Sequence, residues 1–229
     1  MNITISPQVA ARHPTYGAGV LLAKNIQLNA RHAGLISAVI DEALAKMIQA
    51  EHQALAEIEC QGWRGVYKQM ELKASKVLCS FESMYKRARK SGSLPRINPL
   101  VDVYNAISLK HALCLGAYDL EEVKGAIEIR FAAEGESLLP IGASEARELG
   151  PKAIIYADQA GPICAWWNHR DADRTKVEEG TRDGIFFVDD LNLADGRAQR
   201  AIDDLSALIG KIAEPGVQLQ KLVIAGSTH

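Results

Sequence analysis

The sequence has 229 residues, of which 48% are hydrophobic and 24% are charged, and its formal net charge is −2. This is an ordinary globular composition, with enough chain for one large domain or two small ones. The charge excludes a strongly basic nucleic-acid coat but not a local basic patch. No apolar run approaches the roughly 20 residues of a membrane helix, and the first residues lack the pattern of a secretion signal. We therefore expect a cytoplasmic protein without a membrane partner.

The four cysteines are widely spaced and form no CxxC pair; they are Cys60, Cys79, Cys114 and Cys164. This spacing predicts free thiols in a reducing compartment. It also argues against a structural zinc site, because zinc-binding cysteines usually come in closely spaced pairs. The motifs of nucleotide-binding, metalloprotease and serine-hydrolase sites are missing. We therefore expect neither a metal nor a cofactor.

The N-terminal part is predicted to hold a strand over residues 17–23 and two helices. Apolar residues recur at helical spacing from Leu35 to Ile48, which indicates a helix packed against the core. A second helix, over about residues 75–90, ends before Gly92 in four cations: Lys86, Arg87, Arg89 and Lys90. Cations suit the negative end of a helix dipole, and glycine commonly ends helices. This cluster is therefore either a solvated helix end or a set of phosphate contacts.

A third helix is predicted from Asn98 and Pro99, a capping residue followed by proline at the first helical position, to about Leu115. It carries Asp102 and Asn105 among apolar residues. A buried polar group without a partner costs about 1–3 kcal/mol. We therefore expect these two side chains to tie the helix to neighbouring loop backbone and to fix the floor of a pocket.

The second half of the chain changes to a strand-like pattern. Strands are predicted over residues 126–133, 153–157, 161–166 and 184–189, an amphipathic helix over Ile202 to Ile212, and a last strand near the C-terminus. Helices come first and strands follow, without regular βαβ alternation. This order predicts an α+β fold rather than a doubly wound parallel sheet.

The segment from Cys164 to Gly184 is the most unusual part of the chain, because two tryptophans lead directly into dense polar residues. Aromatic residues followed by polar groups suit a pocket rim, where indoles stack on a base or a side chain. Arg170 and Arg174 suit a phosphate or a carboxylate ligand. The other interpretation is a surface loop held together by Arg–Asp pairs. Glu134 to Ser137 is similarly either an ammonium-binding turn or an exposed hairpin turn.

The run from Leu94 to Asp119 resembles the helix that opens the core of the B3/B4 domain, the editing module of the phenylalanyl-tRNA synthetase β subunit. IRFAAEGES, IIYAD and TRDGIFFV follow in the same order. The chain is more similar still to free-standing B3/B4 proteins, because Trp63, Arg64 and Tyr67 precede LPRINPLVD and a WNHRDADRT segment follows. The resemblance covers roughly Pro14 to Leu208.

This resemblance implies an α+β fold of three layers, with a β-sandwich of unusual topology and flanking helices. It implies a single domain over residues 1–229: a helical lead-in (1–93), a core like the synthetase module (94–191), and a C-terminal helix and strand (192–229). In the synthetase the module hydrolyses tyrosine wrongly esterified to phenylalanine tRNA. By analogy, a free-standing copy is expected to bind aminoacyl-tRNA rather than DNA and to deacylate mischarged tRNA in trans.

The residues that carry the fold match the family, whereas those that read the substrate differ. Tyr104 stands where the synthetase has threonine, and Gly116 stands where it has histidine. Its glutamate falls near Val188, beside Asp189, and residues 166–168 replace its glycine-rich stretch. Tyrosine specificity is therefore not carried over to this chain.

Hydrolysis of an aminoacyl ester needs a placed water and a donor for the developing oxyanion. The terminal ribose hydroxyl of the tRNA can assist the water, so no strong protein base is required. The predicted catalytic residues are Tyr104, Ser108, Gly116 and Asn168. The predicted substrate contacts are Glu136, Tyr156, Trp166, Trp167 and Arg170. The predicted phosphate contacts are Lys86, Arg87, Arg89, Lys90 and Arg96. The competing interpretation, favoured by the missing histidine and glutamate, is a non-catalytic module that binds an amino acid, a nucleoside or a tRNA end.

Overall fold

The structure is a computed structural model that describes residues 1–73 and 76–226. Its first elements are β1 (Ile3–Ile5), α1 (Pro7–Arg12) and β2 (Gly17–Lys24), followed by α2 (Ala33–Met47), α3 (Ala50–Gln69) and α4 (Ser80–Ser91). The predicted strand and two helices correspond to β2, α2 and α4, although α4 begins at Ser80 and the predicted first residue of that helix, 75, lies outside the described residues. The sequence reasoning missed β1, α1 and the 20-residue helix α3.

Helix α5 (Pro99–His111) begins as predicted, because the Asn98 side chain accepts a hydrogen bond from the Val101 N–H at 2.9 Å. The predicted end at Leu115 is wrong. Ala112 adopts a left-handed conformation with φ 51°, which stops the helix, and the chain continues as strand β3 (Cys114–Asp119). The apolar residues after Ala112 fit either structure, and pairing with a neighbouring strand decides between them.

The predicted later elements are present. The strands are β4 (Ile127–Phe131), β7 (Ile154–Asp158), β8 (Gly161–Ala165), β10 (Gly184–Asp190) and β11 (Gln218–Ala225), and the helix is α6 (Arg197–Ile212). Three additional two-residue strands are β5 (Ser137–Leu138), β6 (Arg147–Glu148) and β9 (Arg170–Asp171). Strand β10 is buried along its whole length, because it lies between two neighbouring strands and two packed layers.

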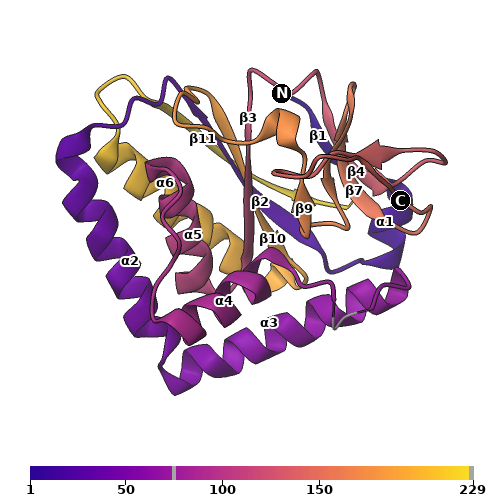
Figure 1. Cartoon of the computed structure of the whole chain (residues 1–229), viewed down its shortest axis with the longest axis horizontal. Coiled ribbons are helices and arrows are strands. Elements are labelled where there is room, and N and C mark those ends of the chain that lie inside the picture. The colour runs from indigo at the N-terminus through magenta and orange to yellow at the C-terminus, as the bar shows by residue number, and fades with distance from the viewer. Residues whose placement is uncertain (74–75, 227–229) are drawn as a thin grey trace.

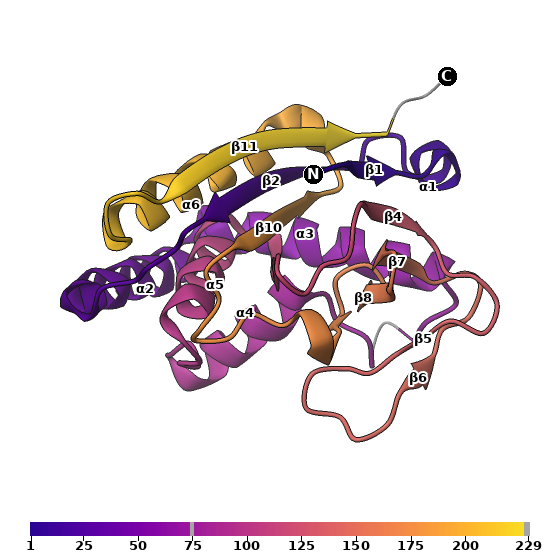
Figure 2. The same cartoon turned by 90° about the horizontal axis from the view of Figure 1, so that it is seen from above.

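The strands form two main sheets, of order β11-β2-β10-β3 and β1-β4-β7-β8-β9, and a small β5-β6 pair. The first sheet is antiparallel throughout, and in the second only β1 and β4 pair in parallel. Helices α5 and α6 cover one face of the first sheet, while α2 and α3 run along the outside of the molecule (Figure 1). In the second view the β5–β6 arm projects away from the body (Figure 2).

Alternate residues of β10 point into different layers. Phe186 faces the helices, where its ring lies 6.2 Å from that of Tyr104. Phe187 faces the second sheet, where its ring meets Tyr156 at 4.9 Å. Two sheets packed face to face with helices on the outside confirm the predicted α+β class. No helix within the described ranges is long and apolar enough to cross a bilayer.

Candidate functional site

Asp189, on β10, is a buried carboxylate between the two sheets. Its Oδ1 accepts hydrogen bonds from the hydroxyls of Tyr16, at 2.7 Å, and of Tyr156. Its Oδ2 accepts one from the amide of Asn168 at 3.0 Å. Burial raises the pKa of Asp189 to about 6, although these three hydrogen bonds act to lower it. The site is therefore built around a carboxylate held by neutral donors.

Asn168 is fixed on both sides of its amide. Its side-chain oxygen accepts a hydrogen bond from the Tyr67 hydroxyl at 2.7 Å, and its backbone oxygen accepts one from the Ser80 N–H at 3.1 Å. The two residues before it, Trp166 and Trp167, have left-handed backbones with φ 51° and 66°. Non-glycine residues rarely adopt this conformation, and such strain is concentrated at functional sites. The strained turn places the Asn168 amide against Asp189.

A small space, here called the inner cavity, adjoins this carboxylate. It is lined by Ser80, Leu115, Gly116, Tyr118, Tyr156, Cys164, Trp167, Asn168, Asp171, Phe187 and Asp189. Its free volume is about 10 Å³, which is close to the least that admits one water molecule. Burial also raises the pKa of Asp171, whose carboxylate accepts a hydrogen bond from Tyr118 at 3.3 Å. The inner cavity therefore presents two carboxylates and no lysine or arginine among its lining residues.

A second space, here called the outer hollow, lies between the first turns of α4, the helix α5 and the segment after the tryptophans. It has a volume of about 300 Å³ and is lined by Lys76, Leu78, Ser80, Ser83, Met84, Arg87, Pro95, Asn105, His169 and Arg170. Three of these residues are cations, and none of the lining residues carries a carboxylate. The outer hollow is therefore suited to an anion, and its polarity is opposite to that of the inner cavity.

The two spaces meet at Ser80, which lines both. Its hydroxyl oxygen is buried and makes no hydrogen bond with any residue the structure describes. The segment after the tryptophans contributes to both sides. Asn168 and Asp171 face the inner cavity, whereas His169 and Arg170 face the outer hollow. A short stretch of chain thus separates an acidic space from a basic one.

The structure brings part of the predicted site together. Gly116, Tyr156, Trp167 and Asn168 line the inner cavity, and Arg170 lines the outer hollow. Trp167 is completely buried rather than at a rim, and its ring packs edge-on against Tyr16 at 4.5 Å. A Cβ atom added to Gly116 would meet only the Tyr118 hydroxyl, at 3.7 Å. Packing of the fold therefore does not require glycine at this position.

Other predicted residues lie elsewhere. Tyr104 lies on α5, in the helix layer, and packs against Phe186 on the side of the sheet opposite the inner cavity. The Ser108 hydroxyl donates to the Leu113 carbonyl at 2.6 Å, which is a helix-end contact. Glu136 pairs with the Arg130 guanidinium through two hydrogen bonds of 2.7 and 2.8 Å, which lowers the pKa of Glu136. Trp166 is half-buried against the His169 ring at 5.8 Å and lines neither space.

Of the predicted phosphate contacts, one lines the outer hollow and the others lie elsewhere. Arg87 lines the outer hollow, where Lys76 and Arg170 join it. Lys86 pairs with Glu82 at 2.7 Å, and Arg89 lies over the Tyr85 ring at 5.8 Å. Together with Lys90, these two line a depression between α3 and α4.

The remaining predicted phosphate contact, Arg96, is exposed but is engaged in an ion pair. Its guanidinium donates to Asp102 at 2.6 Å, and the second oxygen of Asp102 accepts from the Ile97 N–H at 2.8 Å. The prediction that Asp102 ties the helix to loop backbone is confirmed. Asn105, expected to act in the same way, lies in the wall of the outer hollow. Arg174 pairs with the buried Asp158 at 2.6 Å. For this arginine the structure agrees with the interpretation that Arg–Asp pairs hold the segment from Cys164 to Gly184 in place.

Sequence reasoning missed several residues of the site. Ser80, Tyr16 and Asp171 were not singled out, and His169 and Asp189 were noted only as neighbours of other residues. The local signal for Asp189 was weak, because one carboxylate at the end of an apolar strand is common in turns. Among residues 1–73 and 76–226, no three histidine, cysteine, aspartate or glutamate side chains are arranged to hold a metal ion.

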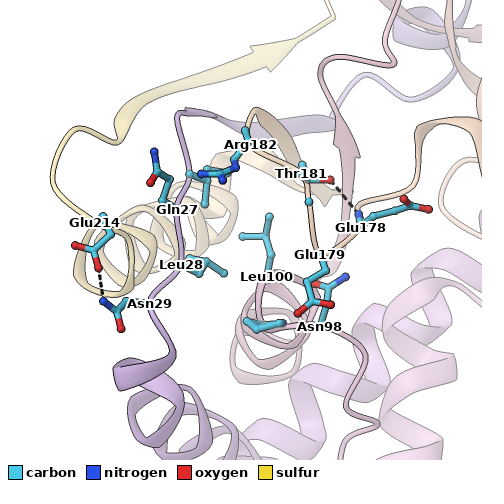
Figure 3. A pocket seen from close by; sticks show the side chains of 13 residues that line it. Gln27, Leu28, Asn29, Asn98, Leu100, Glu178, Glu179, Thr181, Arg182 and Glu214 are labelled. Atoms are coloured by element: carbon cyan, nitrogen blue, oxygen red, sulfur yellow. Dashed lines mark hydrogen bonds between the residues drawn. The ribbon is translucent and has the colours of Figure 1, made fainter.

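A third depression, of about 480 Å³, opens beside the start of α5 (Figure 3). Three glutamates, Glu178, Glu179 and Glu214, and one arginine, Arg182, lie around it. The Thr181 hydroxyl accepts from the Glu178 N–H at 2.9 Å. None of the predicted site residues lines this groove. Its net negative charge disfavours a nucleic-acid backbone, so we do not place the site there.

Comparison with known proteins identifies the family to which the chain is similar. A model of the B3/4 domain family matches residues 62–213. The β subunit of phenylalanine–tRNA ligase from Chromobacterium violaceum is 39% identical over 80 residues, which is 35% of this chain and 10% of that protein. The corresponding protein of Aquifex aeolicus is 32% identical over 106 residues, 46% of this chain and 13% of that protein. The chain thus spans only about a tenth of the length of these relatives.

The fold of the chain is also similar to that of a solved synthetase fragment. An N-terminal fragment of the phenylalanyl-tRNA synthetase β subunit from Pyrococcus horikoshii superposes with a TM-score of 0.50 at 11% sequence identity. The match covers 97% of this chain and 53% of that chain. At this identity the likeness concerns the fold alone. The family match, which includes every residue that lines the two spaces, shows that the chain belongs to the B3/4 domain family.

Proposed function

We propose that this protein binds the aminoacylated 3′ end of a tRNA and hydrolyses its ester in trans. The observation that carries this proposal is the opposite polarity of the two adjoining spaces. An aminoacyl-tRNA end has the same polarity, with a cationic α-ammonium group at one side of the ester and anionic phosphodiesters at the other. The inner cavity matches the ammonium, and the outer hollow matches the phosphates.

The electrostatics of the inner cavity support an ammonium ligand. The buried Asp189 and the half-buried Asp171 lie near one another without a cation among the residues that line the cavity, and desolvation raises the pKa of both. An added positive charge would stabilise the ionised carboxylates. The free volume of about 10 Å³ suits an ammonium group and excludes an amino-acid side chain. That side chain and the ribose would occupy the outer hollow.

The outer hollow supplies the electrostatic attraction for the nucleic acid. Lys76, Arg87 and Arg170 come from three different segments and converge on one space. Phosphate contacts by lysine and arginine provide most of the sequence-independent affinity for nucleic acids. A mildly acidic chain can bind tRNA in this way, because its local charge differs from its net charge.

The second candidate is a binding module without hydrolytic activity, for an amino acid, a nucleoside or a tRNA end. The observation in its favour is Gly116, which stands where the synthetase module carries a histidine. The small free volume of the inner cavity favours it as well. Both functions use the same contacts, so the measurement that separates them is turnover.

The test is a deacylation assay over a panel of aminoacyl-tRNAs, with the Asp189→Asn and Arg170→Ala variants and with Arg200→Ala as the control. Arg200 lies on α6, away from both spaces, and contacts the Asp195 carbonyl. We expect at least one ester to be hydrolysed, with kcat/KM reduced about tenfold or more in the first two variants, the equivalent of 1.4 kcal/mol or more. Survival of every ester at high protein concentration would leave only the binding module.

The extent and the place of action complete the proposal. We propose that residues 1–229 act as one unit with the internal boundaries expected from the sequence, near residues 93 and 191. Strand β11, from the last part, pairs with β2, from the first part, which supports this unit. We further propose that the protein acts in the cytoplasm, where its substrate would be found.

A further inference from the structure

The outer hollow contains a histidine whose ring orientation is fixed by the backbone. The Nδ1 atom of His169 lies 2.7 Å from the carbonyl oxygen of Leu78. A carbonyl oxygen only accepts hydrogen bonds, so Nδ1 must carry the proton. In the neutral ring Nε2 then carries the free lone pair. No hydrogen bond to Nε2 is made within the described parts of the chain.

The surroundings of His169 keep its ring neutral. Burial lowers its pKa below 6.5, and the charges of Arg170 and Arg147 lower it further, against the opposing effect of the Leu78 carbonyl. Lys76 and Arg87 line the same hollow. The rings of Tyr67, on α3, and of Trp166 pack against the imidazole at 6.5 and 5.8 Å. The residues that line the outer hollow include no carboxylate that could stabilise the protonated ring.

We propose that His169 is the general base of the deacylation, acting through Nε2 on a water in the outer hollow. This inference rests on the proposed function. Among the residues that line the outer hollow, His169 is the one whose side chain is an unprotonated base at neutral pH. It directly follows Asn168, which touches Asp189, so the base lies beside the boundary where the ester would be held.

The chemical step follows from this arrangement. Nε2 takes a proton from the water as the water oxygen bonds to the ester carbonyl carbon. When the tetrahedral intermediate collapses, the bond between that carbon and the ribose oxygen breaks, and Nε2 returns its proton to the ribose oxygen. The products are the free amino acid and the tRNA with its terminal hydroxyl restored. The histidine ends the cycle neutral, and no co-reactant other than water is used.

The sharpest variant is His169→Asn, because the asparagine amide can donate to the Leu78 carbonyl in place of Nδ1–H while offering no base. His169→Gln places a neutral polar atom nearer to the position of Nε2. His32→Asn is the matched control, since His32 lies outside both spaces and contacts Arg31. Urea unfolding of each variant checks that the fold is retained.

We expect kcat for the ester hydrolysed in the panel to fall about 10²- to 10⁴-fold in His169→Asn and His169→Gln, with KM changed less than threefold. In the wild type kcat should fall as the pH drops through a value below 6.5, because protonated Nε2 cannot accept the proton. This acid limb of the profile of kcat against pH should be absent from both variants. A limb near pH 6 that persists in kcat/KM belongs to Asp189.

Two outcomes contradict the proposal and are distinguishable. Folded His169→Asn protein with kcat within threefold of the wild type, or with an unchanged acid limb, would remove His169 as the base and leave the proposed function intact. Absence of hydrolysis by the wild type over the whole panel would overturn the proposed function, and the role of His169 with it.

Discussion

The Asn168 amide donates a hydrogen bond to Asp189 at 3.0 Å, and this contact joins the strained tryptophan turn to the central strand β10. The other side of the same amide accepts from Tyr67 at 2.7 Å, on α3. Asn168 therefore connects three segments that are far apart in the sequence. The orientation of its side chain is fixed, because exchanging nitrogen and oxygen would break both hydrogen bonds.

Asn168→Ala is expected to lower the free energy of unfolding by roughly 2–4 kcal/mol, because it leaves two buried groups, on Asp189 and Tyr67, without a partner. Asn192→Ala is the control, since Asn192 is exposed and its side chain makes no capping hydrogen bond; a change within about 0.5 kcal/mol is expected there. Urea unfolding at pH 7 measures both. Equal midpoints for Asn168→Ala and wild type would show that the amide contributes no stability.

The raised pKa of Asp189 predicts a stability that depends on pH. An acid whose pKa is raised from 3.8 to about 6 by folding binds its proton more tightly in the folded state. Stability from this group is fully present below pH 3.8 and is lost as the pH rises through about 6. The loss is on the order of 3 kcal/mol.

Asp189→Asn removes this titration. The unfolding free energy of the variant should improve relative to that of the wild type by roughly 3 kcal/mol between pH 4 and pH 7. Glu59, whose pKa burial raises to about 7, contributes in the same direction to both proteins and cancels in the difference. Urea unfolding at four pH values provides the comparison. If the difference in unfolding free energy between the variant and the wild type stayed constant from pH 4 to pH 7, folding would not raise the pKa of Asp189.

Gly116→Ala is expected to fold with a stability change below about 1 kcal/mol, since the new methyl would touch only the Tyr118 hydroxyl at 3.7 Å. The methyl would fill the inner cavity, so Kd for a non-hydrolysable aminoacyl-adenosine should rise about tenfold. Gly19→Ala is the contrasting variant, because its Cβ would lie 2.6 Å from Ile202 on α6, and a loss of about 1–3 kcal/mol is expected. Unchanged binding by Gly116→Ala would place the ligand outside the inner cavity.

Arg87→Ala should weaken tRNA binding and reduce the slope of log K against log salt by about 1, the effect of losing one phosphate contact. Arg96→Ala should leave the slope unchanged, because Arg96 is engaged with Asp102. Filter binding at several salt concentrations gives both slopes. Equal slopes for Arg87→Ala and wild type would show that Arg87 does not contact a phosphate.

Local sequence determined much of this protein. The Asn98–Pro99 helix start, the strands of alternating or continuous apolar residues and the α+β class follow from capping, φ preference and periodicity, which act over a few residues. The order of motifs from Leu94 to Asp119 was enough to indicate the family. The partial site, with Gly116, Asn168 and Arg170, came from the same local matches.

Tertiary structure decided the rest, because burial and partnership are properties of distant segments brought together. Tyr104, on α5, packs against Phe186 on the helix-covered face of the sheet rather than at the cavity, because the register of β10 with β2 and β3 sets which of its residues point to which layer. The end of α5 was fixed by strand pairing. The separation of an acidic cavity from a basic hollow depends on Ser80, Asp189 and the turn at Trp166–Trp167, which lie far apart in sequence. Charge and free volume at a site depend on which groups share a small space, and no local pattern encodes that.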